Sequence, residues 1–529
     1  MTHDREITAL TATRRMSHGA QLARAARLFP RKVAFQCGDD QRTYAELDER
    51  VTRLARALAA RGVARGDRVA VFMQNSLELV EAYFATCRLG AIVVPVNFRL
   101  VAGEITYILN DAEAKALVVD RELADTAAAV RPRVPSVTTV LATNGAEQTP
   151  GLGAEAYEAA LAAESPEPLL IDVPESDPAF IMYTSGTTGR PKGAVLTHHN
   201  LVMNTLNCAV TQGIHDPEEV WLSGLPLFHI GGLNGILSYL MFGGRSIIMR
   251  SGNFDAAETV DTMEREGVTA CYFVPTQWKA ICEVPGIENR KLSLRRISWG
   301  ASVAPPSVLQ AMARTFPNVP NYNMFGQTEM SSVTCVLRGE DAIRKMGSVG
   351  TPVVNVEARI FDEELNDVPV GEVGEIVYRG PTVMREYWRN PEATAEAFAG
   401  GWFHSGDLCR MDEDGFIYVV DRKKDMIVSG GENIYCAEVE AAIDSHPKVA
   451  EVAVVGIPHE KWVETPCAVV VPTDPADPPT LEEVVEHCRA RLASYKKPTS
   501  LVVVDELPRN ASGKVQKFKL RESLRQRGG

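Results

Sequence analysis

The chain lacks the arrangements of cysteine and histidine that structural metals and disulfide frameworks need. Its 529 residues include ten cysteines, but no C-x-x-C pair and no cluster of histidine with cysteine. Zinc sites and disulfide-rich scaffolds use closely spaced ligands or paired cysteines, so the sequence argues against both. The cysteines are expected to be reduced thiols, as is typical of a cytoplasmic protein.

Long apolar runs are also absent. Residues 1–30 carry charges throughout and have no apolar core, so we expect no signal peptide. No run approaches the roughly 18 consecutive apolar residues of a membrane span. The sequence therefore predicts a cytoplasmic protein with no integral membrane segment.

The chain also lacks an excess of positive charge. Asp and Glu number 68 against 55 Lys and Arg, which gives a net charge of -13. Nonspecific binding to nucleic acid needs a basic face, so no nucleic-acid partner is expected. A local basic pocket for a nucleotide remains compatible with this balance.

What is present is an alternation of strand and helix patterns. Thr43 with Glu46 three residues later forms a capping box, which predicts the start of a helix. Successive strands separated by amphipathic helices are typical of an α/β fold with mostly parallel strands. The length suggests about three or four domains. Strands are predicted at 33–37, 68–73, 91–96, 116–119, 271–275 and 297–302, and helices at 44–62, 76–89 and 102–110.

The stretch Tyr183–Gly193 alternates hydroxyl residues with glycines and carries one lysine, Lys192, near its end. Glycines let backbone N–H groups turn toward an anion, hydroxyls donate hydrogen bonds, and the lysine adds a charge. It does not match G-x-x-x-x-G-K-[ST], because Lys192 does not follow a glycine. A polyphosphate-binding loop is favoured over an ordinary surface turn.

This stretch resembles the phosphate loop of the acyl-adenylate-forming enzymes, and the resemblance extends over roughly residues 25–520 through five motifs in the family's order. It implies a large N-terminal adenylation domain, 1–421, made of αβα-layered subdomains and a β-rich subdomain. A small mobile α+β domain, 422–529, is expected to follow. The implied ATP contacts in the loop are Thr184, Ser185, Gly186, Thr187, Thr188 and Lys192.

A second motif is Leu225-Pro226-Leu227-Phe228-His229, which is similar to the family's P-x-F-H element. His229 is expected to end a strand, where ligands of α/β sheets collect, and to precede a glycine-rich helix start. The resemblance places it beside the substrate carboxylate. Trp299 is bulkier than the family pattern leads us to expect, and it either shortens the acid pocket or belongs to the core. The resemblance assigns the acid pocket to His229, Gly232, Trp299, Ser302 and Met324, and the adenine contact to Gly300 and Ala301.

The segment Tyr322–Glu329 resembles the family's aromatic-Gly-x-Thr-Glu motif. By that resemblance Phe325 stacks on adenine beside Gly326, and Thr328 donates to the α-phosphate. Glu329 holds Mg²⁺, a hard ion that prefers oxygen ligands, and Thr184 is its second predicted contact on the protein.

Two further motifs concern the ribose and the hinge. Asp407, after Gly406 and next to a predicted strand, suits hydrogen bonds from both ribose hydroxyls. In the charged run 421–425, the resemblance makes Arg422 a second ribose contact and Lys424 the hinge on which the small domain turns.

Beyond the hinge, the resemblance implies that Gly430 and Gly431 line the pantetheine tunnel of coenzyme A. Near the end, Lys514 lies in a P-x-x-x-S-G-K context and is implied to reach the nucleotide and the substrate carboxylate. With Lys514, the predicted catalytic residues are His229, Thr328 and Glu329.

These motifs favour an ATP-dependent acid–CoA ligase that forms an acyl-adenylate and then a thioester, with ATP, Mg²⁺ and coenzyme A as cofactors. The alternative is a stand-alone adenylating ligase whose acceptor is a carrier-protein thiol, an amine or another small nucleophile. A noncatalytic nucleotide-binding protein is disfavoured because Lys514, Glu329 and Asp407 are all present. No Lys or Arg lies among the pocket residues, which favours a monocarboxylic fatty or aromatic acid. The sequence leaves the acid unnamed and the oligomeric state open, with a homodimer among the options.

Overall fold

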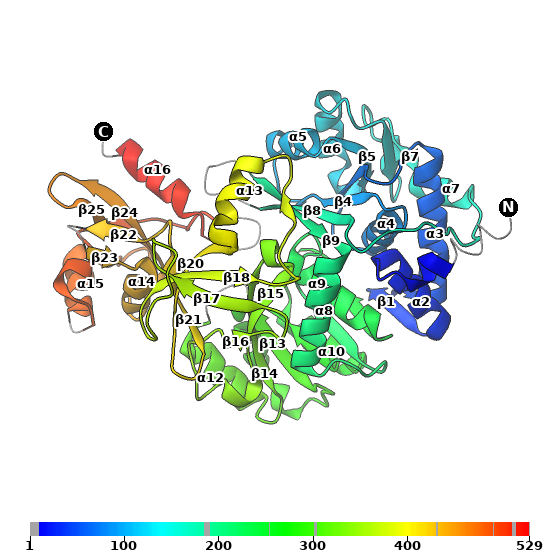
Figure 1. Cartoon of the computed structure of the whole chain (residues 1–529). Helices are drawn as coiled ribbons and strands as arrows, with labels where there is room; N and C mark the ends of the chain where they lie inside the picture. The colour runs from blue at the N-terminus through cyan, green and yellow to red at the C-terminus, as the bar shows by residue number, and fades with distance from the viewer. Residues whose placement is uncertain are drawn as a thin grey trace. The chain divides into compact units, whose positions relative to one another are not determined.

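A computed structural model describes residues 10–184, 191–252, 254–300, 304–429, 432–489, 491–509 and 515–527. The chain divides into two compact units, each described here by itself (Figure 1). The N-terminal unit comprises Met1–Glu357 and Tyr378–Phe403, and the C-terminal unit comprises Ala358–Val377 and His404–Gly529.

The first sheet of the N-terminal unit is eight-stranded, in the order β19-β9-β8-β4-β3-β5-β6-β7. Strands β8 through β7 in this order run parallel, whereas β9 and β19 are antiparallel additions at one edge. The predicted α/β fold is confirmed. The strands are β3 (Arg68–Phe72), β4 (Ile92–Pro95), β5 (Ala114–Val119), β6 (Thr139–Ala142), β7 (Glu155–Ala156), β8 (Pro178–Thr184), β9 (Lys192–Thr197) and β19 (Glu386–Tyr387).

The second sheet is nine-stranded, in the order β16-β15-β14-β13-β12-β10-β11-β1-β2. Its central strands are parallel, and its outer strands β15, β16 and β2 are antiparallel. The strands are β1 (Val33–Cys37), β2 (Asp40–Thr43), β10 (Val220–Ser223), β11 (Arg245–Ile248), β12 (Ala270–Tyr272), β13 (Arg296–Gly300), β14 (Asn321–Gln327), β15 (Ser332–Leu337) and β16 (Thr351–Pro352).

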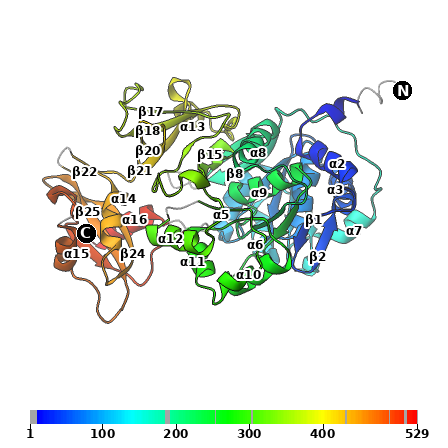
Figure 2. The same ribbon diagram turned by 90° about the horizontal axis from the view of Figure 1, so that it is seen from below.

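Helices pack on both sheets, and the predicted pattern of the first long helix is confirmed. In α3 (Tyr44–Ala60) the capping box of Thr43 with Glu46 is formed, and Leu47, Val51 and Leu58 are buried. Both views place α2, α3 and α7 together in the N-terminal unit (Figures 1 and 2). The helices are α2 (His18–Leu28), α4 (Leu77–Arg88), α5 (Ala102–Asp111), α6 (Ala124–Val130), α7 (Tyr157–Ala162), α8 (His198–Gln212), α9 (Ile230–Met241), α10 (Ala256–Arg265), α11 (Pro275–Cys282), α12 (Pro306–Thr315) and α13 (Pro391–Ala397).

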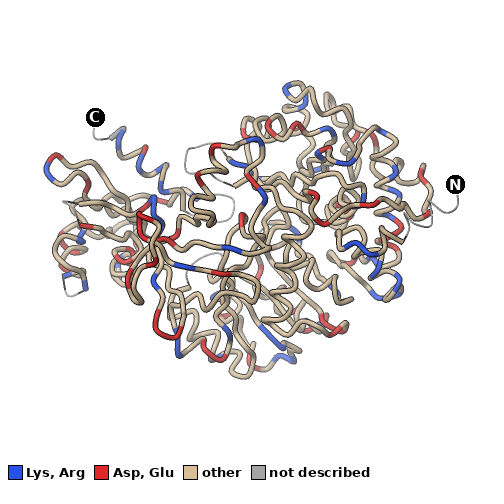
Figure 3. Tube along the Cα trace, viewed as in Figure 1, with Lys and Arg blue, Asp and Glu red and all other residues tan. Residues whose placement is uncertain are grey.

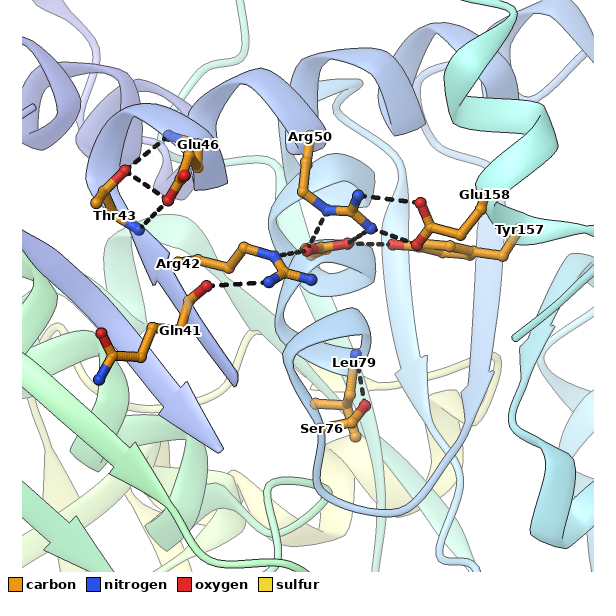
Figure 4. Close-up of polar contacts among 10 residues, drawn as sticks. Gln41, Arg42, Thr43, Glu46, Arg50, Ser76, Leu79, Tyr157 and Glu158 are labelled. Atoms are coloured by element: carbon orange, nitrogen blue, oxygen red, sulfur yellow. Dashed lines mark hydrogen bonds and ion pairs between the residues drawn. The ribbon is translucent and has the colours of Figure 1, made fainter. Parts of the chain in front are cut away.

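A buried ionic network joins three of these helices (Figure 4). Glu81 of α4 is fully buried and accepts from Arg50 Nε at 2.6 Å and Nη2 at 3.0 Å. The hydroxyl of Tyr157 donates to the same carboxylate at 2.8 Å, and Arg50 also pairs with Glu158. Burial raises the pKa of Glu81 even though Arg50 opposes that shift. The network fixes α7 to α3 and α4 through one carboxylate.

Two histidines lie buried against each other between α2 and α8. The His18 backbone N–H donates to Nδ1 of His198 at 3.3 Å, and the ring centroids are 5.0 Å apart. Within the described residues, neither ring nitrogen of His18 nor Nε2 of His198 has a hydrogen-bond partner. Burial lowers the pKa of His198 to about 3 and that of His18 well below 6.5.

This pair should make the N-terminal unit sensitive to acid. Between pH 6.5 and about 3 the unfolded chain binds a proton at His198 that the folded chain excludes. Stability is thus lost as pH falls, by about 1.4 kcal/mol per unit below 6.5. Asn at position 198 keeps an acceptor for His18 N–H but does not titrate. We expect His198→Asn to reduce the stability lost between pH 7.5 and 5.5 by about 1.4 kcal/mol.

Urea unfolding of wild type and variant at the two pH values measures this difference. The neighbouring His199 is exposed, so His199→Asn serves as the matched control and should behave like wild type. Equal loss of stability in wild type and His198→Asn would contradict the assignment to this buried pair.

The C-terminal unit holds two small sheets. The four-stranded one has the order β17-β18-β20-β21, and the other joins β23-β22-β25-β24 with β26 paired to β25. Helix α14 packs on β24 over a core that includes Ile434, Val439 and Val454. The elements are β17 (Glu357–Phe361), β18 (Gly374–Arg379), β20 (Phe403–Met411), β21 (Ile417–Arg422), β22 (Ile427–Ser429), β23 (Glu432–Ile434), α14 (Cys436–Asp444), β24 (Val449–His459), β25 (Val463–Pro472), α15 (Leu481–Cys488), β26 (Ser500–Val503) and α16 (Lys517–Arg527).

Acidic and basic residues are interspersed along the trace (Figure 3). All ten cysteines are free thiols. Across the described part of the chain, every helix is too short or too polar to cross a bilayer.

Candidate active site

The two ends of the predicted phosphate loop are brought together by an antiparallel pair of strands. Thr184, the last residue of β8, lies opposite Lys192, the first residue of β9. A hairpin of this kind places a hydroxyl and an ammonium at the base of one loop. The predicted contacts Ser185, Gly186, Thr187 and Thr188 lie outside the described residues.

The predicted metal-binding carboxylate meets this hairpin. Strand β14 carries Phe325 and Gly326, and the short helix η5 (Thr328–Met330) follows it directly. Glu329 is buried, with 9% of its surface exposed. Thr184 Oγ1 donates to Glu329 Oε1 at 3.3 Å, although the two residues are 145 positions apart in the chain. The fold therefore joins two motifs that the sequence could identify only separately.

Sequence reasoning missed a third member of this cluster, Tyr387 of β19. Its hydroxyl donates to Glu329 Oε1 at 3.0 Å, and the ammonium of Lys192 lies 5.1 Å from the centroid of its ring. Burial raises the pKa of Tyr387, and the neighbouring Glu329 raises it further, so the phenol stays a donor. Strand β19 has only two residues, so no periodic pattern revealed it; the pair Tyr387-Trp388 was the available signal.

A second missed residue, Asn204 of α8, holds the backbone that follows Glu329. The fully buried Asn204 amide donates to Met330 O at 3.2 Å and Val333 O at 2.8 Å. Its oxygen accepts from Val333 N at 3.2 Å. The intervening Ser331 and Ser332 have φ angles of 59° and 116°, in the left-handed region that side chains disfavour. Asn204 thus provides hydrogen-bond partners for the backbone groups of this turn, which would otherwise be costly to bury.

The oxygen atoms of Thr184 and Glu329 fit a magnesium ion that binds together with a nucleotide. No group of three or more His, Cys, Asp or Glu side chains in the described residues is arranged to hold a metal by itself. Mg²⁺ is commonly bound through one or two carboxylates with phosphate oxygens completing its shell. One buried carboxylate beside a phosphate-type hairpin suits that mode.

His229 was expected at the end of a strand, and this detail is wrong. Strand β10 ends at Ser223, and His229 is instead the residue that precedes helix α9, with φ -92° and ψ 146°. The centroids of the His229 and Phe228 rings are 4.4 Å apart. Gly232 lies in the first turn of α9, where an added Cβ would be 2.4 Å from Pro226 O. Glycine is therefore needed at position 232 because the backbones of Gly232 and Pro226 approach each other closely.

The strand that precedes the predicted adenine loop is confirmed as β13. Gly300 at its end pairs with Met324 of β14, and an added Cβ would lie 2.2 Å from Met324 O. Trp299 is 7% exposed and belongs to the core cluster that includes Ile297 and Trp278. Of its two interpretations, the structure favours the core residue. Ala301 and Ser302 lie outside the described residues.

The preceding strand is shorter than predicted. Residues 271–275 were expected to be extended, but β12 ends at Tyr272 and Pro275 begins helix α11. Proline is well tolerated at the first position of a helix because the missing N–H has no partner there.

In the C-terminal unit, Asp407 and Arg422 lie opposite each other on β20 and β21. Arg422 Nε is 2.7 Å from Asp407 Oδ1, and Asp407 is 3% exposed. Asp407 was predicted next to a strand and in fact lies within one. The two predicted ribose contacts thus form one ion pair between neighbouring strands of a small sheet.

The predicted hinge residue Lys424 follows β21. Burial lowers the pKa of its ammonium, while Asp425 opposes the shift. Arg521 of α16 donates to Asp425 Oδ1 at 2.6 Å and to the Lys424 carbonyl at 3.4 Å. The end of the chain therefore braces the segment in which the hinge is predicted. Gly430, Gly431 and Lys514 lie outside the described residues.

An α/β unit with a glycine-rich hairpin, a buried carboxylate beside it and a small α+β unit defines a class of nucleotide-using enzymes. The chain belongs to the AMP-binding enzyme family: the family model matches residues 22–388, and the model of the AMP-binding enzyme C-terminal domain matches 438–514. The sequence-based recognition of the adenylate-forming family is confirmed.

Named relatives match nearly the whole chain. A feruloyl-CoA synthase of Amycolatopsis sp is 39% identical over 95% of this chain and 98% of its own. An indoleacetate–CoA ligase of Aromatoleum aromaticum is 38% identical over 94% and 96%. The solved structure of an o-succinylbenzoate CoA synthetase from Bacillus subtilis, in complex with its acyl-adenylate intermediate, has a TM-score of 0.83. It is 32% identical over 95% of this chain and 97% of that one.

Proposed function

We propose that this protein is an AMP-forming acid–CoA ligase that acts on an aromatic or fatty acid. In the first step a carboxylate oxygen of the acid attacks the α-phosphorus of ATP, and the bond to the pyrophosphate leaving group breaks. In the second step the thiol of coenzyme A attacks the carbonyl carbon of the acyl-adenylate, and AMP leaves. The observation that carries the proposal is the hydrogen bond from Thr184, at the base of the phosphate loop, to Glu329.

The first step joins two anions, so the site must offset negative charge and hold the reactants in line. We assign phosphate binding to Lys192, Thr328 and the loop residues Ser185–Thr188. A bound Mg²⁺ would neutralise charge on the phosphates, and Glu329 with Thr184 would hold it. Phe325 is half-buried at the end of β14, where its ring can stack on adenine.

For the remaining contacts we retain the assignments that the family resemblance implies. Asp407 and Arg422 bind the ribose, and Lys514 reaches the nucleotide and the substrate carboxylate. Rotation about Lys424 would exchange Lys514 for the Gly430–Gly431 loop that lines the thiol tunnel. This exchange explains how one small domain serves two half-reactions.

The names of the relatives support coenzyme A as the acceptor. A carrier-protein thiol or an amine is the alternative acceptor, and a homodimer stays a prediction that sedimentation tests. We place the reaction in the cytoplasm, because ten free thiols suit a reducing compartment.

A panel of acids tests this function. Ferulate, indoleacetate, 2-succinylbenzoate, benzoate and medium-chain fatty acids are each incubated with ATP and magnesium, with and without coenzyme A. We expect acid-dependent exchange of labelled pyrophosphate into ATP, and stoichiometric loss of thiol only when coenzyme A is present. Exchange without thiol loss would favour the alternative acceptor. No exchange with any acid would contradict adenylation.

A further inference from the structure

We propose that Tyr387 is a positioning residue that orients the Glu329 carboxylate for the magnesium ion bound with ATP. The inference rests on the proposed function and adds to it a residue that no motif of the sequence singled out. All of its members, Thr184, Lys192, Glu329 and Tyr387, belong to the N-terminal unit.

Both hydrogen bonds to the Glu329 carboxylate go to the same oxygen. Tyr387 OH donates to Oε1 at 3.0 Å, and Thr184 Oγ1 donates to the same atom at 3.3 Å. Within the described residues no donor lies on Oε2. A carboxylate with one oxygen tied by two hydroxyls has its rotation fixed and presents the other oxygen to a cation. Partners of this kind set the geometry of metal-ligating carboxylates.

The backbone holds Tyr387 firmly enough for this role. Tyr387 pairs with Ala194 in the register of β19 with β9, and its N–H donates to Thr394 Oγ1 at 3.0 Å. Three residues earlier, Met384 N donates to Glu329 O at 2.6 Å. The segment 384–387 therefore contacts Glu329 through both backbone and side chain, which restricts the position of the phenol relative to the carboxylate.

The same ring also contacts the phosphate hairpin. Lys192 Nζ lies 5.1 Å from the centroid of the Tyr387 ring, within the range of a cation–π attraction. Lys192 and Thr184 lie opposite each other at the base of the loop. One aromatic side chain thus links the lysine predicted to bind phosphate and the carboxylate predicted to bind metal.

Tyr387→Phe removes only the hydroxyl and keeps the ring under Lys192. We expect the magnesium concentration that half-saturates binding of a non-hydrolysable ATP analogue to rise about tenfold or more, the usual effect of losing such a partner. Isothermal titration calorimetry over a series of magnesium concentrations measures it. In excess EDTA, wild type and variant should bind the analogue equally.

Two further variants separate positioning from a general structural effect. Tyr157→Phe removes another tyrosine–glutamate hydrogen bond, of 2.8 Å to the buried Glu81, and should leave the magnesium dependence unchanged. In a Glu329→Gln background, Tyr387→Phe should change the magnesium dependence no further, because the residue acts through that carboxylate. Fully additive effects of the two substitutions would overturn the proposal.

A normal magnesium dependence in Tyr387→Phe would also overturn it, while leaving the proposed function intact. Failure of the wild-type protein itself to bind the analogue, with or without magnesium, would instead contradict the proposed function. A rise of the half-saturating magnesium concentration in Tyr387→Phe alone, with Tyr157→Phe at the wild-type value, supports the assignment.

Discussion

Glu329→Gln should lower the rate of acid-dependent pyrophosphate exchange by about 100- to 1000-fold, the usual cost of removing one preorganised group that stabilises developing charge. The amide keeps the shape of the side chain and its contact with Tyr387, but it brings no negative charge to the cation. Thioester formation from supplied acyl-adenylate and coenzyme A uses no pyrophosphate leaving group. It should stay within several-fold of wild type.

The matched control is Glu386→Gln, one residue before Tyr387. In the part of the chain that the structure describes, the Glu386 side chain forms a surface pair, 3.5 Å from Arg385, and is 43% exposed. Such pairs contribute about 0–1 kcal/mol, so exchange should be unchanged within about twofold. Equal loss of exchange and of thioester formation in Glu329→Gln would indicate a folding defect rather than a role in the first half-reaction.

Arg50→Met should destabilise the N-terminal unit by about 3–5 kcal/mol at pH 7.5, because it leaves the fully buried Glu81 without its main cation. Burial already raises the pKa of Glu81. A group with a raised folded-state pKa is least costly when protonated, so the penalty of the variant should shrink as pH falls toward 5.5. Urea unfolding at both pH values measures the change.

Two comparisons make this result specific. Arg53→Met on the same helix removes an ion pair with Glu49, four residues earlier, and a hydrogen bond to the Glu164 carbonyl. It leaves no buried charge unpaired, so it should cost only about 1–2 kcal/mol. The double variant Arg50→Met/Glu81→Gln removes both charges, keeps an acceptor for the buried Tyr157 hydroxyl and should recover most of the lost stability. If the double variant were less stable than Arg50→Met alone, the buried carboxylate would not be the cause.

Local chemistry explains which parts of the fold could be predicted. The capping box at Thr43, the buried face of α3 and the first parallel strands follow from residue types within a few positions of one another. Helix α6 (Ala124–Val130) and strand β6 (Thr139–Ala142) were missed because both are short and fully or partly buried, without an alternating pattern.

The division into domains follows a similar logic. The boundary predicted at 421–422 rests on a charged run, and it stays a prediction. The compact C-terminal unit includes Ala358–Val377 and resumes at His404. A sheet that recruits strands from separate parts of the chain cannot be delimited by composition, because its strands are ordinary alternating segments until they pair.

The sequence by itself determined the family and the chemistry of the chain, because the phosphate loop, Glu329 and Asp407 are recognised by residue type and order alone. Only the tertiary structure decided which groups hold that chemistry in place. Tyr387 and Asn204 contact the Glu329 turn from 58 and 126 positions away, at Glu329 and Met330 respectively. Strand pairing and helix packing bring these residues together, and no local pattern encodes which partner each will meet.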